Sequence, residues 1–483
     1  MEEEWGERAR EMDGLQEMEK IEDLLLSKND IALATDLYEL TMAAAYFKSN
    51  QADRIGVFEA FVRKLPRSRS YMVAAGLEQA IHYLLNIRFT NEQIRYLRST
   101  ETFRNVGEDF FDYLKNFRFT GDVWAVPEGT VLFPNEPILR IEAPIIESQI
   151  AETFLLSIIN FESLIATKAS RITNAAKGRK IIEFGSRRAH GPQAALLAAR
   201  ASYIGGCIGT SNTLASYKLG IPAFGTMAHS FVMNFESEVD AFMEFTKVFP
   251  DGLLLVDTYD TLAAVKKIVK QGIHAKGIRL DSGDLYELSI KTREILDNGG
   301  YKDMIIMASG DLNEYIISDM VKRNAPIDLF GVGTELTTSR DDPAMNGVYK
   351  LVAIRIPFLE KEKQSTVLYK LKTSPGKKTY PGPKQIHRIS GQDGLIKTDL
   401  VTLEEEQSPD HYIPLLTKYL ENGRLEHSLL LPSLDEIQKH HQAQMKMLPD
   451  DYKRLDITAE KFPVIFSDKL EAVTREFLIR GYK

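Results

Sequence analysis

Several side chains that could bind an anionic ligand follow short apolar segments in the middle of the chain. One histidine, His229, lies in the stretch Gly225-Thr-Met-Ala-His-Ser230. Arginines, acids and glycine-rich turns follow the other apolar segments, in Phe184-Gly-Ser-Arg187-Arg188, Asp257-Thr-Tyr, Arg279-Leu-Asp281-Ser-Gly-Asp284, Ser309-Gly310-Asp311 and Gly331-Val-Gly333-Thr334. A lone loop histidine more often packs or caps than reacts, so these neighbours decide how His229 is interpreted.

The glycine-rich turns suit a phosphate ligand. In Ser309-Gly310-Asp311 and Gly331-Val-Gly333-Thr334 side chains obstruct the backbone N–H groups little, and such groups bind oxyanions. In a parallel barrel the phosphate usually lies beside the last strands, which is where these two turns fall. We therefore expect both turns to contact a phosphate.

The charged residues suit the rest of such a ligand. Arg187, Arg188 and Arg279 offer fixed positive charge and forked donors for carboxylate or phosphate. Asp281 and Asp284 are hard oxygen ligands, suited to Mg²⁺ carried by a pyrophosphate or to ribose hydroxyls. The alternative is that Asp281, or the serine after it, only caps a helix beginning at Asp284. Together these residues indicate a phosphoribosyl and pyrophosphate site.

The elements that must position these side chains follow from the apolar pattern. Strands are expected at 180–184, 221–224, 253–256, 275–279, 304–308 and 328–330. Each of the first five is followed by a helix-like segment, which indicates a parallel sheet with the polar residues at its carboxyl edge. The repeated unit lacks a Gly-x-Gly-x-x-Gly fingerprint, which favours an irregular parallel α/β barrel. The alternative is an open doubly wound sheet.

The flanking regions read as further α/β structure. Before the barrel we expect a helix capped by Thr35 with Tyr38 in its first turn, a small β-domain at 121–142, and one long helix at 147–170. After it we expect strands at 348–356 and 366–371, a basic turn-rich segment at 370–384, and helices at 433–447 and 474–479. The predicted division is a polar extension (1–27), a split α+β N-terminal domain (28–150), the barrel (151–345), and a small C-terminal extension returning to the N-terminal domain (346–483).

Composition limits the class of protein. A net charge of −8 argues against a nucleic-acid-binding surface, and one cysteine, Cys207, allows no disulfide framework within the chain. No apolar run reaches about 18 residues, so no membrane span is expected. The acidic first 27 residues fit neither a secretory nor a mitochondrial signal. A cytoplasmic protein is therefore the expectation.

The motifs, taken in order, resemble the nicotinate phosphoribosyltransferase family. They are Thr35-Asp-Leu-Tyr38, Glu183-Phe-Gly-Ser-Arg-Arg-Ala189, Gly209-Thr-Ser-Asn212, Gly225-Thr-Met-Ala-His-Ser230, Arg279-Leu-Asp-Ser-Gly-Asp284, Phe330-Gly-Val-Gly-Thr334 and Lys377-Lys-Thr-Tyr-Pro-Gly382. The resemblance implies a split N-terminal domain packed on an irregular barrel, a cytoplasmic homodimer, and active sites near the subunit boundary. The implied reaction joins nicotinate to phosphoribosyl pyrophosphate, giving nicotinate mononucleotide and pyrophosphate for NAD salvage, coupled to ATP hydrolysis with Mg²⁺.

The resemblance also implies roles for single residues. His229 would be phosphorylated by ATP, and Arg279 and Asp281 would contact the ribose and phosphates. Phe184 would stack on the pyridine ring with Tyr38, the latter from the partner subunit. Arg187 and Thr226 would meet the pyridine carboxylate or hold the polar edge of the ring, and the choice between Arg187 and Arg279 for the carboxylate stays open. The residues expected to hold the 5′-phosphate and ribose are Ser309, Gly310, Asp311, Gly331, Gly333 and Thr334.

Ser211 bears on the choice of substrate. The nicotinamide-specific relatives have an aspartate at this loop position, where it accepts from an amide NH₂. Here Ser211 stands in Gly209-Thr-Ser-Asn212, and a serine can donate to a carboxylate. The sequence therefore favours the acid, nicotinate, over nicotinamide. A third alternative is a non-catalytic barrel that keeps the pocket as a binding module, which the retention of His229 beside Arg279 and Asp281 argues against.

Overall fold

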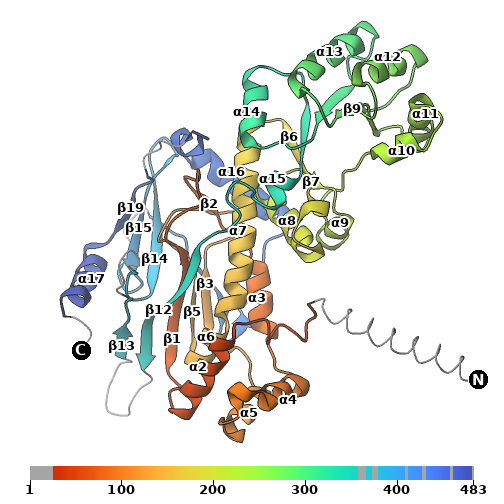
Figure 1. The fold of residues 1–483 in the computed structure, drawn as a ribbon. Coiled ribbons are helices and arrows are strands. Elements are labelled where there is room, and N and C mark those ends of the chain that lie inside the picture. Colours follow the sequence, from red (N-terminus) through yellow and green to blue (C-terminus); the bar gives the residue numbers. More distant parts are fainter. Residues whose placement is uncertain are drawn as a thin grey trace, which may run out of the picture.

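The computed structural model describes residues 26–356, 366–372, 379–407, 412–426, 431–456 and 461–480. An N-terminal α+β body packs alongside one long helix, α7, and a parallel α/β body lies beyond the carboxyl end of that helix (Figure 1). The first body contains α2 (Leu37–Lys48), β1 (Ile55–Val62), β2 (Met72–Val73), α3 (Leu77–Asn86), α4 (Asn91–Ser99), α5 (Glu108–Lys115), β3 (Asp122–Ala125), β4 (Val131–Leu132), β5 (Pro137–Pro144) and α6 (Ile145–Ile150). Residues 1–25, which make up most of the predicted polar extension, lie outside the described part. The predicted domain limits stay predictions.

A seven-stranded sheet forms the core of the N-terminal body. Its order is β13-β12-β1-β5-β3-β17-β18, with β12 (Gly347–Ile356), β13 (Thr366–Tyr369), β17 (Thr417–Glu421) and β18 (Arg424–Leu425) coming from the C-terminal region. The central strand β1 is buried over seven of its eight residues, as its apolar sequence predicts. The expectation of a separate small β-domain at 121–142 is wrong, because β3 and β5 pair with each other and β5 pairs with β1.

Helix α7 (Glu152–Ala175) connects the two bodies. At 24 residues it is about 36 Å long. The prediction of one continuous helix over 147–170 is wrong, because α6 ends at Ile150 and α7 begins after Ala151. The break has a physical reason: the buried Glu39 of α2 accepts the N–H of Thr153 (3.0 Å) and so caps the first turn of α7. The cap of α2 itself is Asp36 rather than the expected Thr35.

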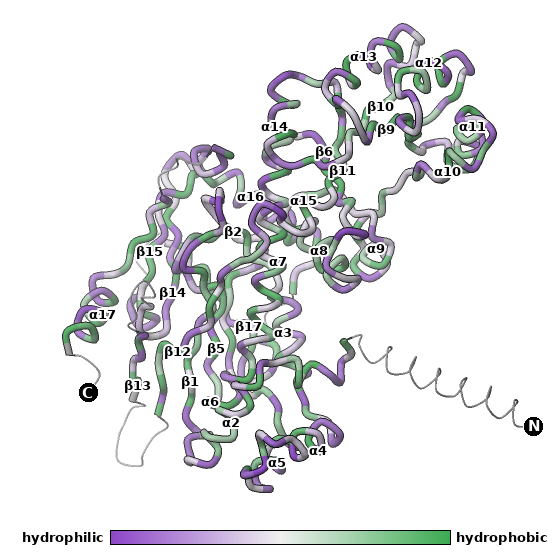
Figure 2. Tube along the Cα trace, viewed as in Figure 1, coloured by the Kyte–Doolittle hydropathy of each residue, from purple (hydrophilic) through white to green (hydrophobic). Residues whose placement is uncertain are grey.

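The second body is built on a curled, six-stranded parallel sheet. It contains β6 (Lys180–Glu183), α8 (Pro192–Ile204), β7 (Gly209–Thr210), α9 (Thr213–Leu219), α10 (His229–Met233), α11 (Glu238–Val248), β8 (Leu253–Leu255), α12 (Thr261–Gln271), β9 (Gly277–Leu280), α13 (Leu285–Asn298), β10 (Ile305–Ala308), α14 (Glu314–Lys322), β11 (Leu329–Val332) and α15 (Thr334–Thr337). Hydrophobic and hydrophilic residues alternate along the peripheral helices α11, α12 and α13, as expected of helices with one face on a sheet (Figure 2).

The strand order identifies the sheet as an incomplete barrel. The order is β7-β6-β11-β10-β9-β8, so the last strand, β11, pairs in parallel with the first, β6. This pairing gives the strands the circular order of a barrel. The circle is interrupted between β7 and β8, where no strands pair in the described residues. The predicted α/β barrel is confirmed in this half-barrel form, and the doubly wound alternative is wrong because the order never reverses.

The predicted strand at 221–224 is wrong. Within this segment only Ala223 forms a bridge, in parallel with Thr210, while the Pro222 carbonyl accepts the Thr210 N–H at 3.0 Å. Pro222 has no N–H to continue a ladder. The strand beside β6 is instead the two-residue β7, which is too short to produce a periodic pattern.

The C-terminal region returns along the N-terminal body. It adds the sheet β16-β14-β15-β19, made of β14 (Lys384–Ser390), β15 (Ile396–Leu403), β16 (Ile413–Pro414) and β19 (Val464–Phe466). The predicted helix at 433–447 is α16 (Leu434–Met447), which begins with a capping box formed by Ser433 and Glu436. Helix α17 (Asp468–Arg480) is longer than expected. Residues 373–378 of the basic segment lie outside the described part. None of the described helices has the length and hydropathy needed to cross a membrane.

Candidate active site

Arg279 connects the ends of β9 and β10 with the segment around Thr226 at the carboxyl edge of the half-barrel. It lies in β9, where its Nε donates to Ser309 Oγ (2.7 Å), which follows β10. Its Nη1 donates to Thr226 Oγ1 (3.0 Å), and its Nη2 donates to Asp281 Oδ1 (2.6 Å). A planar guanidinium with several fixed donors can make these contacts at once. The predicted convergence of these residues on one edge of the sheet is therefore observed.

Asp281 is held as a carboxylate within this cluster. Its Oδ1 also accepts the hydroxyl of Ser309 at 2.5 Å. Burial raises the pKa of Asp281, but the hydrogen bond from Ser309 and the charge of Arg279 outweigh it and bring the pKa below 3.8. The side chain remains 23% exposed, so the ionised group still faces solvent at neutral pH.

His229 lies at the edge of the same cluster. It is the first residue of α10, and its side chain is 44% exposed. Its Nδ1 is 3.1 Å from Thr258 Oγ1, and its Nε2 is 3.9 Å from Asp281 Oδ2. The first contact orients the ring, and the second is too long for a hydrogen bond. The imidazole is thus oriented, close to a carboxylate and accessible to a ligand.

Sequence reasoning gave no role to two residues that the structure places in this site. Thr258 contacts His229, and its neighbour Asp257 accepts the hydroxyl of Ser282 at 2.6 Å. The other oxygen of Asp257, Oδ1, is buried and has no hydrogen-bond partner in the described part of the chain. Both residues follow β8, and the sequence placed the Asp257-Thr-Tyr segment at a strand end without assigning either residue a role.

Phe184 forms an apolar wall next to Arg279. The Arg279 Cζ lies 5.5 Å from the centroid of the Phe184 ring, and the Phe184 N–H donates to the Val332 carbonyl at 2.8 Å. A Cβ on Gly331 would come within 2.7 Å of this ring. The glycine at 331 is therefore required by the packing of Phe184, in addition to any contact with phosphate.

The two glycine-rich turns lie side by side. The turn Ser309–Asp311 follows β10 and the turn Gly331–Thr334 follows β11, and these strands pair through Met307 and Leu329. Gly310 has φ +94°, and a Cβ there would lie 2.0 Å from the Asp281 carbonyl. Asp311 is also left-handed, with φ +43°. The first turn thus depends on glycine for both its conformation and its closeness to Asp281.

Ser211 and the arginine pair lie on the neighbouring part of the edge. The N–H of Ser211 donates to the Glu183 carbonyl at 2.9 Å. This exposed serine therefore lies beside the residue that precedes Phe184 in the chain. Arg187 and Arg188 lie in a short 3₁₀ turn and are exposed. Within the described ranges neither arginine side chain forms a hydrogen bond or an ion pair, so both guanidinium groups are available to an anionic ligand.

Tyr38 is not brought to this site by its own chain. It lies in the first turn of α2, where the preceding Asp36 contacts Thr153 at the start of α7. The half-barrel contacts α7 near Lys168, about 22 Å further along the helix axis. A role for Tyr38 in the site therefore requires a second copy of the chain.

The acids of the site do not form a metal cage by themselves. The helix cap at α13 is Asp284, which accepts the Glu287 N–H at 3.1 Å, so capping by Asp281 or Ser282 is wrong. Asp281 is engaged by Arg279 and Ser309. Among the residues that the structure describes, no group of three or more His, Cys, Asp or Glu side chains could hold a metal ion. These side chains suit a cation that takes most of its ligands from a bound substrate.

Three family models match successive parts of the chain. Models of the nicotinate phosphoribosyltransferase N-terminal domain, family and C-terminal domain match residues 33–160, 179–393 and 411–474. A nicotinate phosphoribosyltransferase of Mycobacterium tuberculosis is 44% identical over 447 residues, covering 91% of this chain and 92% of the relative. One of Bacillus subtilis is 38% identical over 467 residues, covering 91% and 94%. The crystal structure of human nicotinic acid phosphoribosyltransferase superposes with a TM-score of 0.77 at 26% identity, covering 92% of this chain and 99% of that one.

Proposed function

This chain belongs to the nicotinate phosphoribosyltransferase family, and from that premise we propose that it makes nicotinate mononucleotide for NAD salvage in the cytoplasm. The nitrogen of nicotinate forms a bond to ribose C1 of phosphoribosyl pyrophosphate, and the C1–oxygen bond to pyrophosphate breaks. The observation that carries this proposal is the three-way contact of Arg279 with Thr226, Ser309 and Asp281. This contact supports the proposal because it fixes one cation among the groups proposed to bind the two substrates.

The proposed binding of nicotinate uses the apolar wall and the groups beside it. The pyridine ring stacks on Phe184, with Tyr38 of the partner subunit on its other face in a homodimer. The carboxylate meets Arg187 or Arg279 together with Thr226, and Ser211 donates to it or to a bridging water. This arrangement positions the ring nitrogen against the ribose.

The proposed binding of phosphoribosyl pyrophosphate uses the other half of the edge. The turns Ser309–Asp311 and Gly331–Thr334 hold the 5′-phosphate and ribose through backbone N–H groups. Asp281, ionised at neutral pH, faces the ribose, where positive charge develops as pyrophosphate leaves. Mg²⁺ carried by the pyrophosphate, with Asp281 or Asp284 as additional oxygen ligands, neutralises part of the leaving charge.

We assign the coupling to ATP to His229. One of its imidazole nitrogens takes the terminal phosphoryl group of ATP, ADP leaves, and later hydrolysis by water releases phosphate and restores the ring. The phosphohistidine adds negative charge and acceptor oxygens beside Asp281 and Arg279. This charge helps to organise the pyrophosphate and its cation. The contact of Nδ1 with Thr258 supports an oriented ring.

The test is product formation with purified protein. Nicotinate mononucleotide or nicotinamide mononucleotide is measured chromatographically, with nicotinate or nicotinamide respectively as acceptor, with and without phosphoribosyl pyrophosphate. We expect the product only with nicotinate and the pyrophosphate donor together. Faster turnover of nicotinamide would identify the amide-specific activity instead. Absence of product, with phosphoribosyl pyrophosphate still bound, would identify a non-catalytic binding module.

A further inference from the structure

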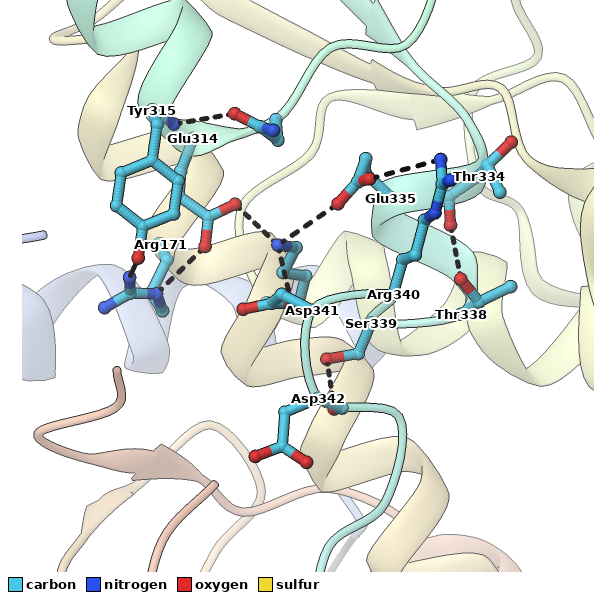
Figure 3. Close-up of polar contacts among 12 residues, drawn as sticks. Arg171, Glu314, Tyr315, Thr334, Glu335, Thr338, Ser339, Arg340, Asp341 and Asp342 are labelled. Atoms are coloured by element: carbon cyan, nitrogen blue, oxygen red, sulfur yellow. Dashed lines mark hydrogen bonds and ion pairs between the residues drawn. The ribbon is translucent and has the colours of Figure 1, made fainter. Parts of the chain in front are cut away.

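A buried lysine, Lys168 of α7, connects three acidic side chains of the half-barrel. Its Nζ lies 2.6 Å from Glu314 Oε2, 2.9 Å from Asp341 Oδ1 and 3.8 Å from Glu335 Oε2. The side chains of Lys168 and Glu314 are 1% and 0% exposed. In Figure 3 the carboxylates of Glu314 and Glu335 point toward a shared position between α14 and α15. One ammonium group thus serves as the common partner of all three acids.

Two of these acids lie directly behind the candidate phosphate turns. Glu314 is the first residue of α14, which follows the turn Ser309–Asp311. Glu335 is the second residue of α15, immediately after the turn Gly331–Thr334. Asp341 lies a few residues further along the same segment. Lys168 therefore holds together the starts of the two helices that carry the two turns.

The other cations nearby cannot replace this connection. Arg171 donates its Nε to Glu314 (3.2 Å), and Arg69 donates to both oxygens of Asp341 (2.7 and 3.0 Å). Neither contacts acids of both helices. Burial raises the pKa of Glu314, yet the charge of Lys168, followed by that of Arg171, brings it below 4.5. Loss of Lys168 would leave buried carboxylates without their shared counter-ion.

We propose that Lys168 is a positioning residue for phosphoribosyl pyrophosphate, which fixes the distance between the Ser309–Asp311 and Gly331–Thr334 turns although it touches no substrate. This proposal rests on the proposed function of the two turns. A displacement of about 1 Å between groups that bind one phosphoribosyl unit is enough to weaken binding greatly. Nicotinate binds against Phe184 and Ser211, which Lys168 does not contact, so its binding is expected to change little.

The test compares Lys168→Met, Lys168→Arg and Glu335→Gln with a matched control, Lys384→Met. Lys384 is also a buried lysine, 2.7 Å from the buried Glu59, but it lies in β14 far from the turns. KM for each substrate and direct binding of phosphoribosyl pyrophosphate are measured alongside the melting temperature. We expect Lys168→Met to raise KM and Kd for phosphoribosyl pyrophosphate about ten- to hundredfold, with KM for nicotinate nearly unchanged. Lys168→Arg restores most of the loss, and Lys384→Met lowers the melting temperature alone.

Glu335→Gln keeps the experiment decisive if Lys168→Met does not fold. It removes the longest of the three Lys168 contacts, together with the 3.7 Å ion pair of Glu335 with Arg340, at a partly exposed residue. It should raise Kd for phosphoribosyl pyrophosphate without lowering the melting temperature greatly. Unchanged phosphoribosyl pyrophosphate binding in the folded variants would overturn the proposal, as would an equal rise in both KM values. A wild-type protein that makes no nicotinate mononucleotide would instead contradict the proposed function.

Discussion

Arg279 and its contacts explain why the residues after separate strands act as one site. The side chain reaches Thr226, Ser309 and Asp281. The hydrogen bond from Ser309 and the charge of Arg279 keep the pKa of Asp281 low despite burial. His229 stands beside this cluster and is oriented by Thr258. At the scale of residues, the site combines four groups: the apolar ring of Phe184, the fixed charge of Arg279, the ionised carboxylate of Asp281 and the accessible imidazole of His229.

Ser211 provides the residue-scale prediction on specificity. It is exposed one residue from Phe184, where a carboxylate would repel nicotinate and accept a hydrogen bond from an amide. Ser211→Asp should lower kcat/KM for nicotinate about a hundredfold and improve relative use of nicotinamide. Ser211→Asn, which has similar size and no charge, is the control. Unchanged nicotinate turnover in Ser211→Asp would show that this residue does not select the acid.

At the scale of elements, the turn after β10 is the most constrained part of the site. Gly310→Ala should weaken phosphoribosyl pyrophosphate binding about tenfold or more, because a Cβ would lie 2.0 Å from the Asp281 carbonyl and the left-handed backbone disfavours alanine. Gly272→Ala is the matched control: φ is +66° there, and a Cβ would meet nothing within 4 Å. Both variants lose stability, measured by denaturant unfolding, but only Gly310→Ala should lose binding. Equal binding by the two would contradict this role of Gly310.

The junction of α2, α6 and α7 predicts a pH dependence of stability. Burial raises the pKa of Glu39 and of Glu147 from 4.5 to about 7. Because the folded pKa lies above the unfolded one, the protonated groups stabilise the fold at low pH. This contribution is lost as the pH rises from about 4.5 through 7. The melting temperature should therefore fall between pH 5 and 8 in part through these groups.

Glutamine substitutions test that dependence. Glu39→Gln and Glu147→Gln mimic the protonated acids and should each reduce the fall in melting temperature. Glu92→Gln, at an exposed position of α4, should leave it unchanged. An equally steep fall in all three variants would mean that these buried carboxyls are ionised throughout the range.

The sequence predicted the elements with strong periodicity and missed those set by single contacts. Alternation of apolar strands and helices located β6, β8, β9, β10 and β11 within a few residues, and Ser433 marked the start of α16. The break at Ala151 was not predictable, because it depends on Glu39, more than a hundred residues away in the chain. The strand β7 was missed because two residues carry no periodicity. The rule that polar residues at the carboxyl ends of parallel strands form sites led to Arg279 and Asp281. The sequence around Lys168 carries no pattern that indicates its role.

At the scale of the whole molecule, α7 separates Tyr38 from the half-barrel of its own chain. If each site takes Tyr38 from the other subunit, two variants that have each lost the ATP-stimulated rate should restore it together. Tyr38→Ala and His229→Ala chains, co-expressed with different tags, should form mixed dimers with one intact site, giving about a quarter of wild-type activity in a random mixture. The purified mixed dimer is assayed beside each homodimer. No recovery of activity would show that Tyr38 does not act across a subunit boundary.

The most direct test of the account is the effect of ATP on the rate of nicotinate mononucleotide formation, for wild type and for His229→Ala. His229 is half-exposed and makes one hydrogen-bond contact, with Thr258, so its loss should leave the fold and the Arg279 cluster intact. We predict that ATP stimulates the wild-type rate, and that His229→Ala keeps a slow basal rate that ATP no longer changes. Equal stimulation of both proteins by ATP, or none in the wild type, would contradict the assignment of His229 as the phosphate acceptor.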